Sequence, residues 1–248
     1  MRSISEGAPI SEPQQALLSY VFMGLAFAGF TLVTFWAGVM VARGLGTKAG
    51  FSIAPLGFSR PRGGFLSGIF LGLLVGAGAV LASMFVNLAT ISVFGRLDLP
   101  TERTVQAPYM QGLADWVRES PGPAIPAIIF VVVIFGPAFE EFIFRGVVFN
   151  GLYRLGSRIS GRLAEGNPAG TARMVSFVLA AIVSSALFAL LHLEPVLLPA
   201  LVIIAVALCA LFARTGSLLP PFVAHATFNS FAVTFIILNG LGVIELPA

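Results

Sequence analysis

Six stretches of the sequence are almost continuously apolar, and each is about as long as a membrane-crossing helix. They cover residues 16–42, 64–95, 122–155, 174–193, 196–213 and 218–240. A hydrocarbon core roughly 30 Å thick is crossed by about 20 residues of α-helix. The pattern therefore predicts an all-α fold: a polytopic transmembrane bundle of about six to eight membrane helices. The first stretch is too long for a removable signal peptide, so we expect it to remain as a span.

The second and third stretches exceed the length of one crossing. Glycines recur at every fourth position in the second, at Gly64, Gly68, Gly72 and Gly76, which is typical of a helix that another helix approaches closely. The third contains Gly136-Pro137, where the proline lacks a backbone donor and disfavours helix at the preceding residue. We expect the third stretch to break there or to extend beyond the bilayer.

Basic residues gather in alternate loops, which predicts the orientation of the bundle. Three loops hold nine of the 14 Lys and Arg residues: Arg43, Lys48, Arg60 and Arg62; Arg154, Arg158, Arg162 and Arg173; and Arg214. Cytoplasmic loops carry such an excess, so the pattern predicts six crossings with both termini outside. Residues 156–172 are expected to form a mobile cytoplasmic loop. Most acidic residues fall in the other loops and tails, among them Glu194.

The composition narrows the class of protein further. Only 10% of the residues are charged and 57% are hydrophobic, which excludes a cytosolic enzyme, a disulfide scaffold and a disordered chain. The single cysteine, Cys209, lies in an apolar run and has no partner for a disulfide. A net charge of +3 in such a chain does not imply nucleic acid. We expect an integral protein of the cell membrane, plasma or inner, with lipid as its surroundings.

Very few polar side chains interrupt the apolar stretches, and these are the candidate functional residues. Ionisable groups inside a membrane cost a few kcal/mol each, so they are kept mainly for function. All of these polar residues lie in the second half of the chain. We therefore distinguish N-terminal membrane helices and loops, residues 1–121, from a core that carries the candidate residues, 122–248, within one membrane unit. The candidates of the core are Glu140, Glu141 and Arg145 in the third stretch, His192 in the fourth, and His225 and Asn229 in the sixth.

Helical spacing assigns the two glutamates different surroundings. Glu141 and Arg145 are one turn apart on one face, where they can neutralise each other. Glu140 is rotated by roughly 100° from Glu141 and can present a free carboxylate elsewhere. The alternative is a single structural salt-bridge cluster of Glu140, Glu141 and Arg145 that joins two helices.

His225 and Asn229 share one helical face inside an apolar span and therefore need polar partners. Taken alone, His192 is equally compatible with a satisfied core residue. Together, a glutamate and a histidine can deprotonate water, while a second histidine and an amide can stabilise an oxyanion. The same glutamate and two histidines also match the ligands of a catalytic zinc ion. Both arrangements remain open at this point.

Three motifs in order resemble a known family. Glu140-Glu141-x-x-x-Arg145, Phe188-x-x-x-His192 and His225-x-x-x-Asn229 are similar to the motifs of the CPBP intramembrane proteases, which include the type II CAAX prenyl endopeptidases and bacteriocin-immunity relatives. The resemblance extends over residues 137–230. It implies a helical membrane endopeptidase with a site open to the cytoplasm, acting on a peptide or lipidated protein such as a prenylated CAAX-type substrate.

The resemblance also implies roles for the candidate residues. Glu140 and His192 would activate water, His225 and Asn229 would form the oxyanion hole, and Glu141 with Arg145 would support the site. A divalent metal such as zinc is one implied cofactor, and a metal-free glutamate mechanism is the other possibility. Two alternatives of a different class are an ion- or proton-coupled transporter and a non-catalytic immunity or scaffold protein. Asn229 favours the protease, since a proton relay does not need an amide that cannot titrate.

Six simple crossings conflict with a common site. His192 would lie near the outer end of its helix and His225 near the inner end of its own, roughly 20 Å apart along the membrane normal. Two repairs are available: a deeply inserted, non-spanning segment over 194–219, or a break at Pro137 that adds a crossing.

Overall fold

A computed structural model describes residues 12–44, 53–102, 106–163 and 169–245, and within these ranges the chain forms helices, turns and loops without a strand. Six helical segments of the described chain are long and apolar enough to cross a membrane: Glu12–Val41, Phe65–Arg96, Pro121–Ser157, Gly170–Leu190, Pro195–Thr215 and Leu219–Gly240. They agree with the six apolar stretches to within a few residues. The predicted all-α membrane bundle is confirmed.

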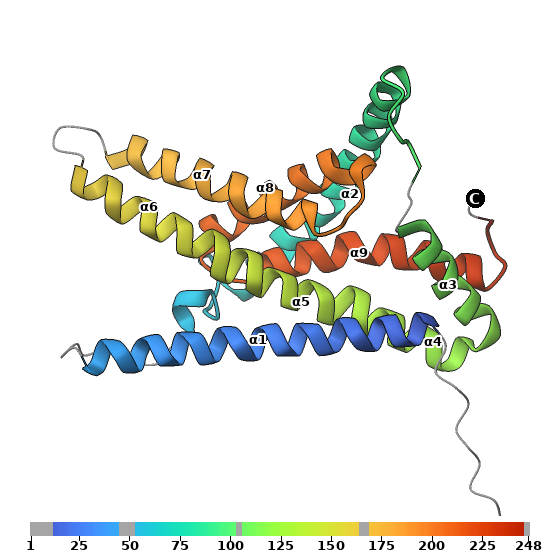
Figure 1. Cartoon of the computed structure of the whole chain (residues 1–248), viewed down its shortest axis with the longest axis horizontal. Helices are drawn as coiled ribbons and strands as arrows, with labels where there is room; N and C mark the ends of the chain where they lie inside the picture. The colour runs from blue at the N-terminus through green and yellow to red at the C-terminus, as the bar shows by residue number, and fades with distance from the viewer. Residues whose placement is uncertain (1–11, 45–52, 103–105, 164–168, 246–248) are drawn as a thin grey trace, which may run out of the picture.

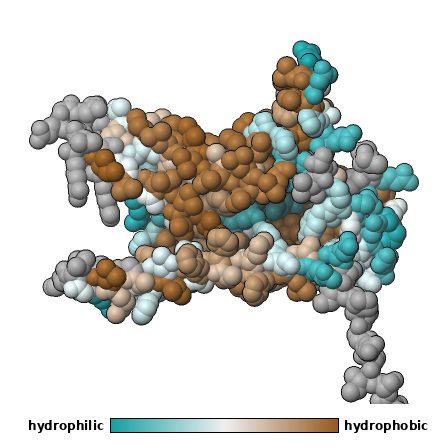
Figure 2. All heavy atoms as spheres, in the orientation of Figure 1, coloured by the Kyte–Doolittle hydropathy of each residue, from teal (hydrophilic) through white to brown (hydrophobic). Residues whose placement is uncertain are grey.

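Figure 1 shows how the helices are arranged. The elements are α1 (Glu12–Gly44), η1 (Ala54–Leu56), α2 (Phe65–Arg96), α3 (Gln106–Glu119), α4 (Pro121–Ile128), η2 (Ile129–Phe135), α5 (Gly136–Glu141), η3 (Phe142–Phe149), α6 (Asn150–Leu163), α7 (Ala169–Leu190), η4 (Pro195–Leu197), α8 (Leu198–Thr215) and α9 (Leu219–Gly240). The segments η1 and η4 are 3₁₀ turns, whereas η2 and η3 are π-helical. Figure 2 shows hydrophobic surface over α7 and its neighbours and hydrophilic surface at the end that carries α3.

The glycine stripe on α2 forms the contact with α9. A Cβ atom on Gly72 would lie 2.7 Å from the carbonyl oxygen of Pro220, and one on Gly76 would lie 2.5 Å from that of Ala224. Only glycine lets two backbones come this close. The predicted close approach is therefore confirmed, and it fixes the half of α9 that carries His225.

The third span is one helix longer than a single crossing, so of the two expectations for this stretch the extension is confirmed and the break at Pro137 is wrong. The elements α4, η2, α5, η3 and α6 follow one another without a gap. The π-helical turn of η2 makes this possible, because the N–H of Gly136 donates to Val131, five residues earlier. In this wider turn the missing donor of Pro137 is accommodated without ending the helix.

The helix continues into a region that was expected to be a loop. Within 156–172, α6 runs to Leu163 and α7 starts at Ala169. The composition of this segment is polar, but Leu152, Leu155 and Ile159 recur at helical spacing, and this amphipathic pattern outweighs the composition. The two helices pack closely, since a Cβ atom on Gly156 would lie 3.0 Å from the hydroxyl of Ser176.

The α6–α7 hairpin removes the conflict between the two histidines. Leu218, just before α9, lies 3.6 Å from the Cβ position of Gly146, whereas α6 runs on to Leu163, about 25 Å further along its axis. Figure 1 shows the hairpin extending past the start of α9. The start of α7 and the start of α9 therefore lie at different depths. The end of α7 and the first turns of α9 lie side by side, where the rings of His192 and His225 both approach Phe188. Neither a non-spanning segment over 194–219 nor a break at Pro137 is needed to bring the two histidines together.

Candidate active site

The paired acids lie at the centre of the long third helix, on α5. Glu141 and Arg145 are both fully buried and form an ion pair, with Nη1 of Arg145 2.9 Å from Oε1 of Glu141. Nη2 of Arg145 also donates to the carbonyl oxygen of Ala205 on α8, at 3.3 Å. The guanidinium lies 4.8 Å from the ring centroid of Phe188 on α7. The expected pair between Glu141 and Arg145 is thus present, and its cation joins three helices.

His225 connects the two carboxylates. Its Nδ1 atom lies 2.8 Å from Oε1 of Glu141, and its Nε2 atom lies 3.6 Å from Oε2 of Glu140. Because Glu141 is paired with a guanidinium, its oxygen accepts and Nδ1 of His225 carries the proton. This hydrogen bond fixes the imidazole so that Nε2 faces Glu140.

His192 follows the end of α7 and lies on the other side of Phe188. Its Nδ1 atom is 2.8 Å from the carbonyl oxygen of Phe188, so Nδ1 donates and Nε2 is left for another partner. The ring centroid of Phe188 lies 4.7 Å from that of His192 and 5.7 Å from that of His225. The structure therefore brings both histidines around one aromatic ring. The hydrogen bonds of the described residues do not link His192 to Glu140 directly.

Asn229 lies one turn beyond His225 and contacts the long helix. Its Nδ2 atom donates to the carbonyl oxygen of Val132, at 2.9 Å. In the π-helical register of η2 this oxygen would accept from residue 137, five positions later, but residue 137 is a proline. The amide of Asn229 thus supplies the donor that Pro137 lacks.

Sequence reasoning missed two buried polar contacts, one of them with Glu140. Tyr20 on α1 donates a hydrogen bond to Oε1 of Glu140. Glu194, expected in an outer loop, is fully buried, and its Oε2 atom accepts from the N–H of Gln106 at the start of α3. A tyrosine in an apolar span is a weak signal for function, and nothing in the sequence pairs α1 with α5. Glu194 lies in the short link between two apolar stretches, and nothing near it in the sequence indicates that its partner is the backbone of Gln106.

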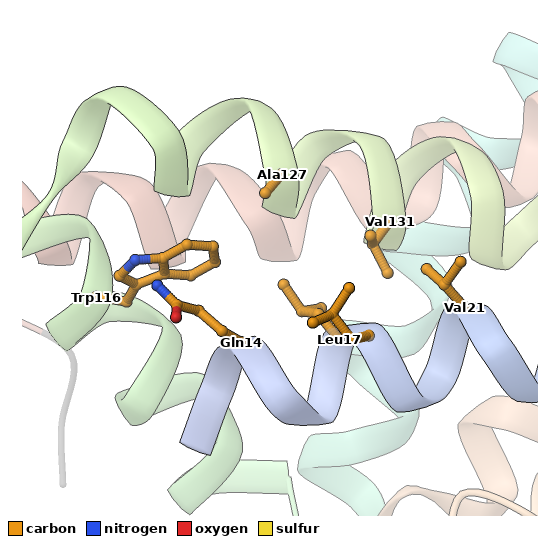
Figure 3. Close-up of a pocket in the computed structure, with 7 residues that line it drawn as sticks. Gln14, Leu17, Val21, Trp116, Ala127 and Val131 are labelled. Atoms are coloured by element: carbon orange, nitrogen blue, oxygen red, sulfur yellow. The ribbon is translucent and has the colours of Figure 1, made fainter. Parts of the chain in front are cut away.

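The described chain also has an apolar pocket beside α1, away from the paired acids. Its volume is about 280 Å³, and it lies between α1, α3, α4 and η2 (Figure 3). Its lining residues are Gln14, Leu17, Leu18, Val21, Trp116, Ala127 and Val131. Leu17 and Val21 flank Tyr20 along α1, so the pocket follows the same helix interface that brings Tyr20 to Glu140.

The site offers three side chains that a metal ion could in principle use. A catalytic zinc ion takes three protein ligands, and Glu140, His192 and His225 are the set that the sequence offers. Across the residues that the structure describes, no three His, Cys, Asp or Glu side chains lie close enough to hold a metal ion. As arranged, these described residues do not fit a metal ion.

Comparison with known proteins supports the three motifs. Residues 122–231 match a family model described as Rce1-like, type II CAAX prenyl endopeptidase. The resemblance inferred from the motifs is confirmed. This segment contains Glu140, His192, His225 and Asn229 but excludes α1, and with it Tyr20.

Two curated relatives are similar over the same part of the chain. The chain is 35% identical over 115 residues to the membrane-embedded CAAX protease MroQ of Staphylococcus aureus, covering 46% of this chain and 41% of that protein. It is 29% identical over 110 residues to the putative membrane peptidase YdiL of Bacillus subtilis, covering 44% and 37%. The match thus spans less than half the length of either relative. No solved structure matches the chain. Together with the six apolar helices, the relatives support an integral membrane protein.

Proposed function

We propose that this protein is a membrane-embedded endopeptidase that hydrolyses a peptide bond near the cytoplasmic interface of the cell membrane. The observation that carries the proposal is that one carboxylate oxygen of Glu140 is buried without a hydrogen-bond donor among the described residues. Its Oε2 atom is buried and accepts no hydrogen bond from the described residues, while Nε2 of His225 lies 3.6 Å away. A buried carboxylate oxygen without a donor is costly unless a substrate or water uses it.

Each candidate residue has a role in this proposal. Oε2 of Glu140 accepts a proton from a water molecule, whose oxygen attacks the peptide carbonyl, and later returns the proton to the leaving amine. The Nε2 atom of His192 helps to orient that water. When His225 is protonated on both nitrogens, Nε2 donates to the oxyanion while Nδ1 donates to Glu141, and the second amide hydrogen of Asn229 is a further donor. Glu141 and Arg145 keep His225 in place.

The substrate that we propose is a membrane-associated peptide, of which a prenylated CAAX-type C-terminus is one form. Support comes from the family model over 122–231 and from a relative named as a CAAX protease. The mostly apolar, lipid-facing surface of the bundle is consistent with a substrate that arrives through the membrane.

The experiment uses the purified full chain in proteoliposomes and two quenched fluorogenic peptides, one with a farnesylated CAAX C-terminus and one without the farnesyl group. Wild-type protein should cleave at least the farnesylated peptide, and Glu140→Gln should abolish cleavage while the protein stays folded. Glu119→Gln, the same substitution on an exposed carboxylate of α3, is the matched control and should cleave normally. Cleavage by Glu140→Gln at the wild-type rate would refute the assignment, and no cleavage by wild type would favour a transporter or scaffold.

A further inference from the structure

The two oxygens of the Glu140 carboxylate have different surroundings. Oε1 accepts the hydrogen bond from the hydroxyl of Tyr20. Oε2 faces Nε2 of His225 at 3.6 Å and accepts no hydrogen bond from the described residues. Tyr20 is thus the one side-chain donor to Glu140 among the described hydrogen bonds. Oε1 is therefore held by Tyr20, whereas Oε2 can accept a hydrogen bond from a water molecule or a substrate.

The contact depends on a close approach of α1 to the long helix. A Cβ atom on Gly136 would lie 3.1 Å from the hydroxyl oxygen of Tyr20, and one on Gly24 would lie 2.8 Å from the ring of Phe135. One glycine on each helix, about one turn from the contact, therefore makes room for the other helix. Leu17, which is buried, anchors the preceding turn of α1. The hydroxyl of Tyr20 thus reaches Glu140 at an interface where a glycine of one helix faces an aromatic ring of the other.

We propose that Tyr20 is a positioning residue for Glu140, an inference that rests on the proposed peptidase activity. The terminal torsion of a glutamate is broad, so a carboxylate held by no donor samples many orientations. By engaging Oε1, Tyr20 fixes the carboxylate plane and leaves Oε2 directed at the water and at His225. A phenol suits this role because it donates one hydrogen bond without adding a charge, whereas a lysine or arginine would neutralise the base. A helix outside the family-matched segment therefore completes the site.

The first test is steady-state kinetics of Tyr20→Phe with the farnesylated peptide in proteoliposomes. The variant keeps the ring and the packing of α1 but removes the donor. We expect kcat to fall by about 10- to 100-fold with KM changed less than about twofold, because a loosened base slows the chemical step without altering substrate binding. Tyr153→Phe removes the same atom from a tyrosine on α6 and should behave as wild type. A Tyr20→Phe variant with wild-type kcat, or with a loss confined to KM, would overturn the proposal.

The second test does not depend on cleavage. The chain has three tyrosines, so Tyr109→Phe with Tyr153→Phe leaves Tyr20 as the only one. Ultraviolet resonance Raman spectra of this single-tyrosine protein should show a hydroxyl that donates strongly, and Glu140→Ala in the same background should abolish that signature. Identical spectra would overturn the contact itself. If wild type cleaves no peptide, the peptidase proposal fails, and this spectroscopic result decides the Tyr20–Glu140 contact alone.

Discussion

The side-chain amide of Asn229 donates to the backbone carbonyl oxygen of Val132, at 2.9 Å, and thereby joins α9 to the π-helical turn that precedes the paired acids. This bond uses one of the two hydrogens on Nδ2, so the other is available to a ligand. One amide can therefore hold the helix that carries Glu140 and also serve a developing oxyanion. A serine has a single side-chain hydrogen and a histidine has at most one on each ring nitrogen, so neither residue at position 229 could donate two hydrogen bonds from one atom.

Replacement of Asn229 by alanine should affect stability and catalysis together. Asn229→Ala leaves the Val132 carbonyl without its donor, which should lower the free energy of unfolding by roughly 1–3 kcal/mol. The loss of an oxyanion donor should reduce kcat by about 100- to 1000-fold with substrate binding nearly intact. Thermal unfolding and peptide cleavage measure the two effects separately. Normal proteolysis by a folded Asn229→Ala protein would remove the oxyanion assignment.

Glu141→Gln should mainly destabilise the protein. The substitution leaves the fully buried Arg145 as an unpaired charge and weakens the hydrogen bond to His225, and breaking a buried pair in this way costs about 3–5 kcal/mol. Glu140→Gln, by contrast, should keep nearly the wild-type unfolding temperature. The comparison of the two variants in thermal unfolding is the measurement. Equal unfolding temperatures for both would show that the two acids do not divide their roles as proposed.

The contact of α2 with α9 provides a test with an internal control. Gly76→Ala should lower the free energy of unfolding by about 1–3 kcal/mol, because the new Cβ would meet the Ala224 carbonyl oxygen at 2.5 Å and the neighbouring His225 would shift. Gly78→Ala should be harmless, because nothing lies within 4 Å of its Cβ position. The free energy of unfolding and the rate of peptide cleavage should both fall in Gly76→Ala and stay at wild-type values in Gly78→Ala. A Gly76→Ala protein as stable as Gly78→Ala would contradict this packing.

The orientation of the bundle also remains a prediction. In a Cys209→Ala background, a cysteine at Arg60 should react with a membrane-impermeant maleimide only from the cytoplasmic side, and a cysteine at Leu99 only from outside. Both positions are exposed and lie at opposite ends of α2. Lys48, which is part of the charge pattern, lies outside the described residues. Labelling of the Arg60 position from outside intact cells would reverse the orientation.

Chelation should leave cleavage largely unchanged. Among the described residues, no three His, Cys, Asp or Glu side chains lie close enough together to hold a metal ion. The measurement is the cleavage rate before and after treatment with 1,10-phenanthroline, with the non-chelating 1,7-isomer as control. Loss of activity that zinc restores would show that the site rearranges to hold a metal in the active protein.

Much of the fold could be predicted because lipid imposes a simple rule on sequence. Apolar runs at least as long as a bilayer crossing predicted the six spans, and the glycine period predicted that another helix packs closely on α2, which the structure shows to be α9. Pro137 was misjudged because a π-helical turn and the distant amide of Asn229 together replace its missing donor. Neither compensation is visible in the residues next to the proline.

The candidate site could be predicted only where spacing along one helix determines it. The Glu141–Arg145 pair follows from a separation of four residues, and the structure shows it. The contact of Tyr20 with Glu140 spans 120 residues and depends on how α1 packs against α5. The depth of His192 relative to His225 likewise depends on how far α6 projects, which was hidden because its amphipathic sequence resembles a loop in composition.

The short α5 segment, with Glu140 and Glu141, lies between two π-helical stretches of seven and eight residues. A π-helical turn holds one more residue than an α-helical turn, so the direction of each carboxylate depends on residue number as well as on residue type. Deleting one residue from 129–135 would restore an α-helical turn and rotate Glu140 by about 100° relative to the face of α4 that packs on α3. The long helix is therefore tolerant of apolar exchanges in this stretch and intolerant of insertions or deletions, which would point the carboxylates away from Tyr20 and His225 while leaving every motif intact.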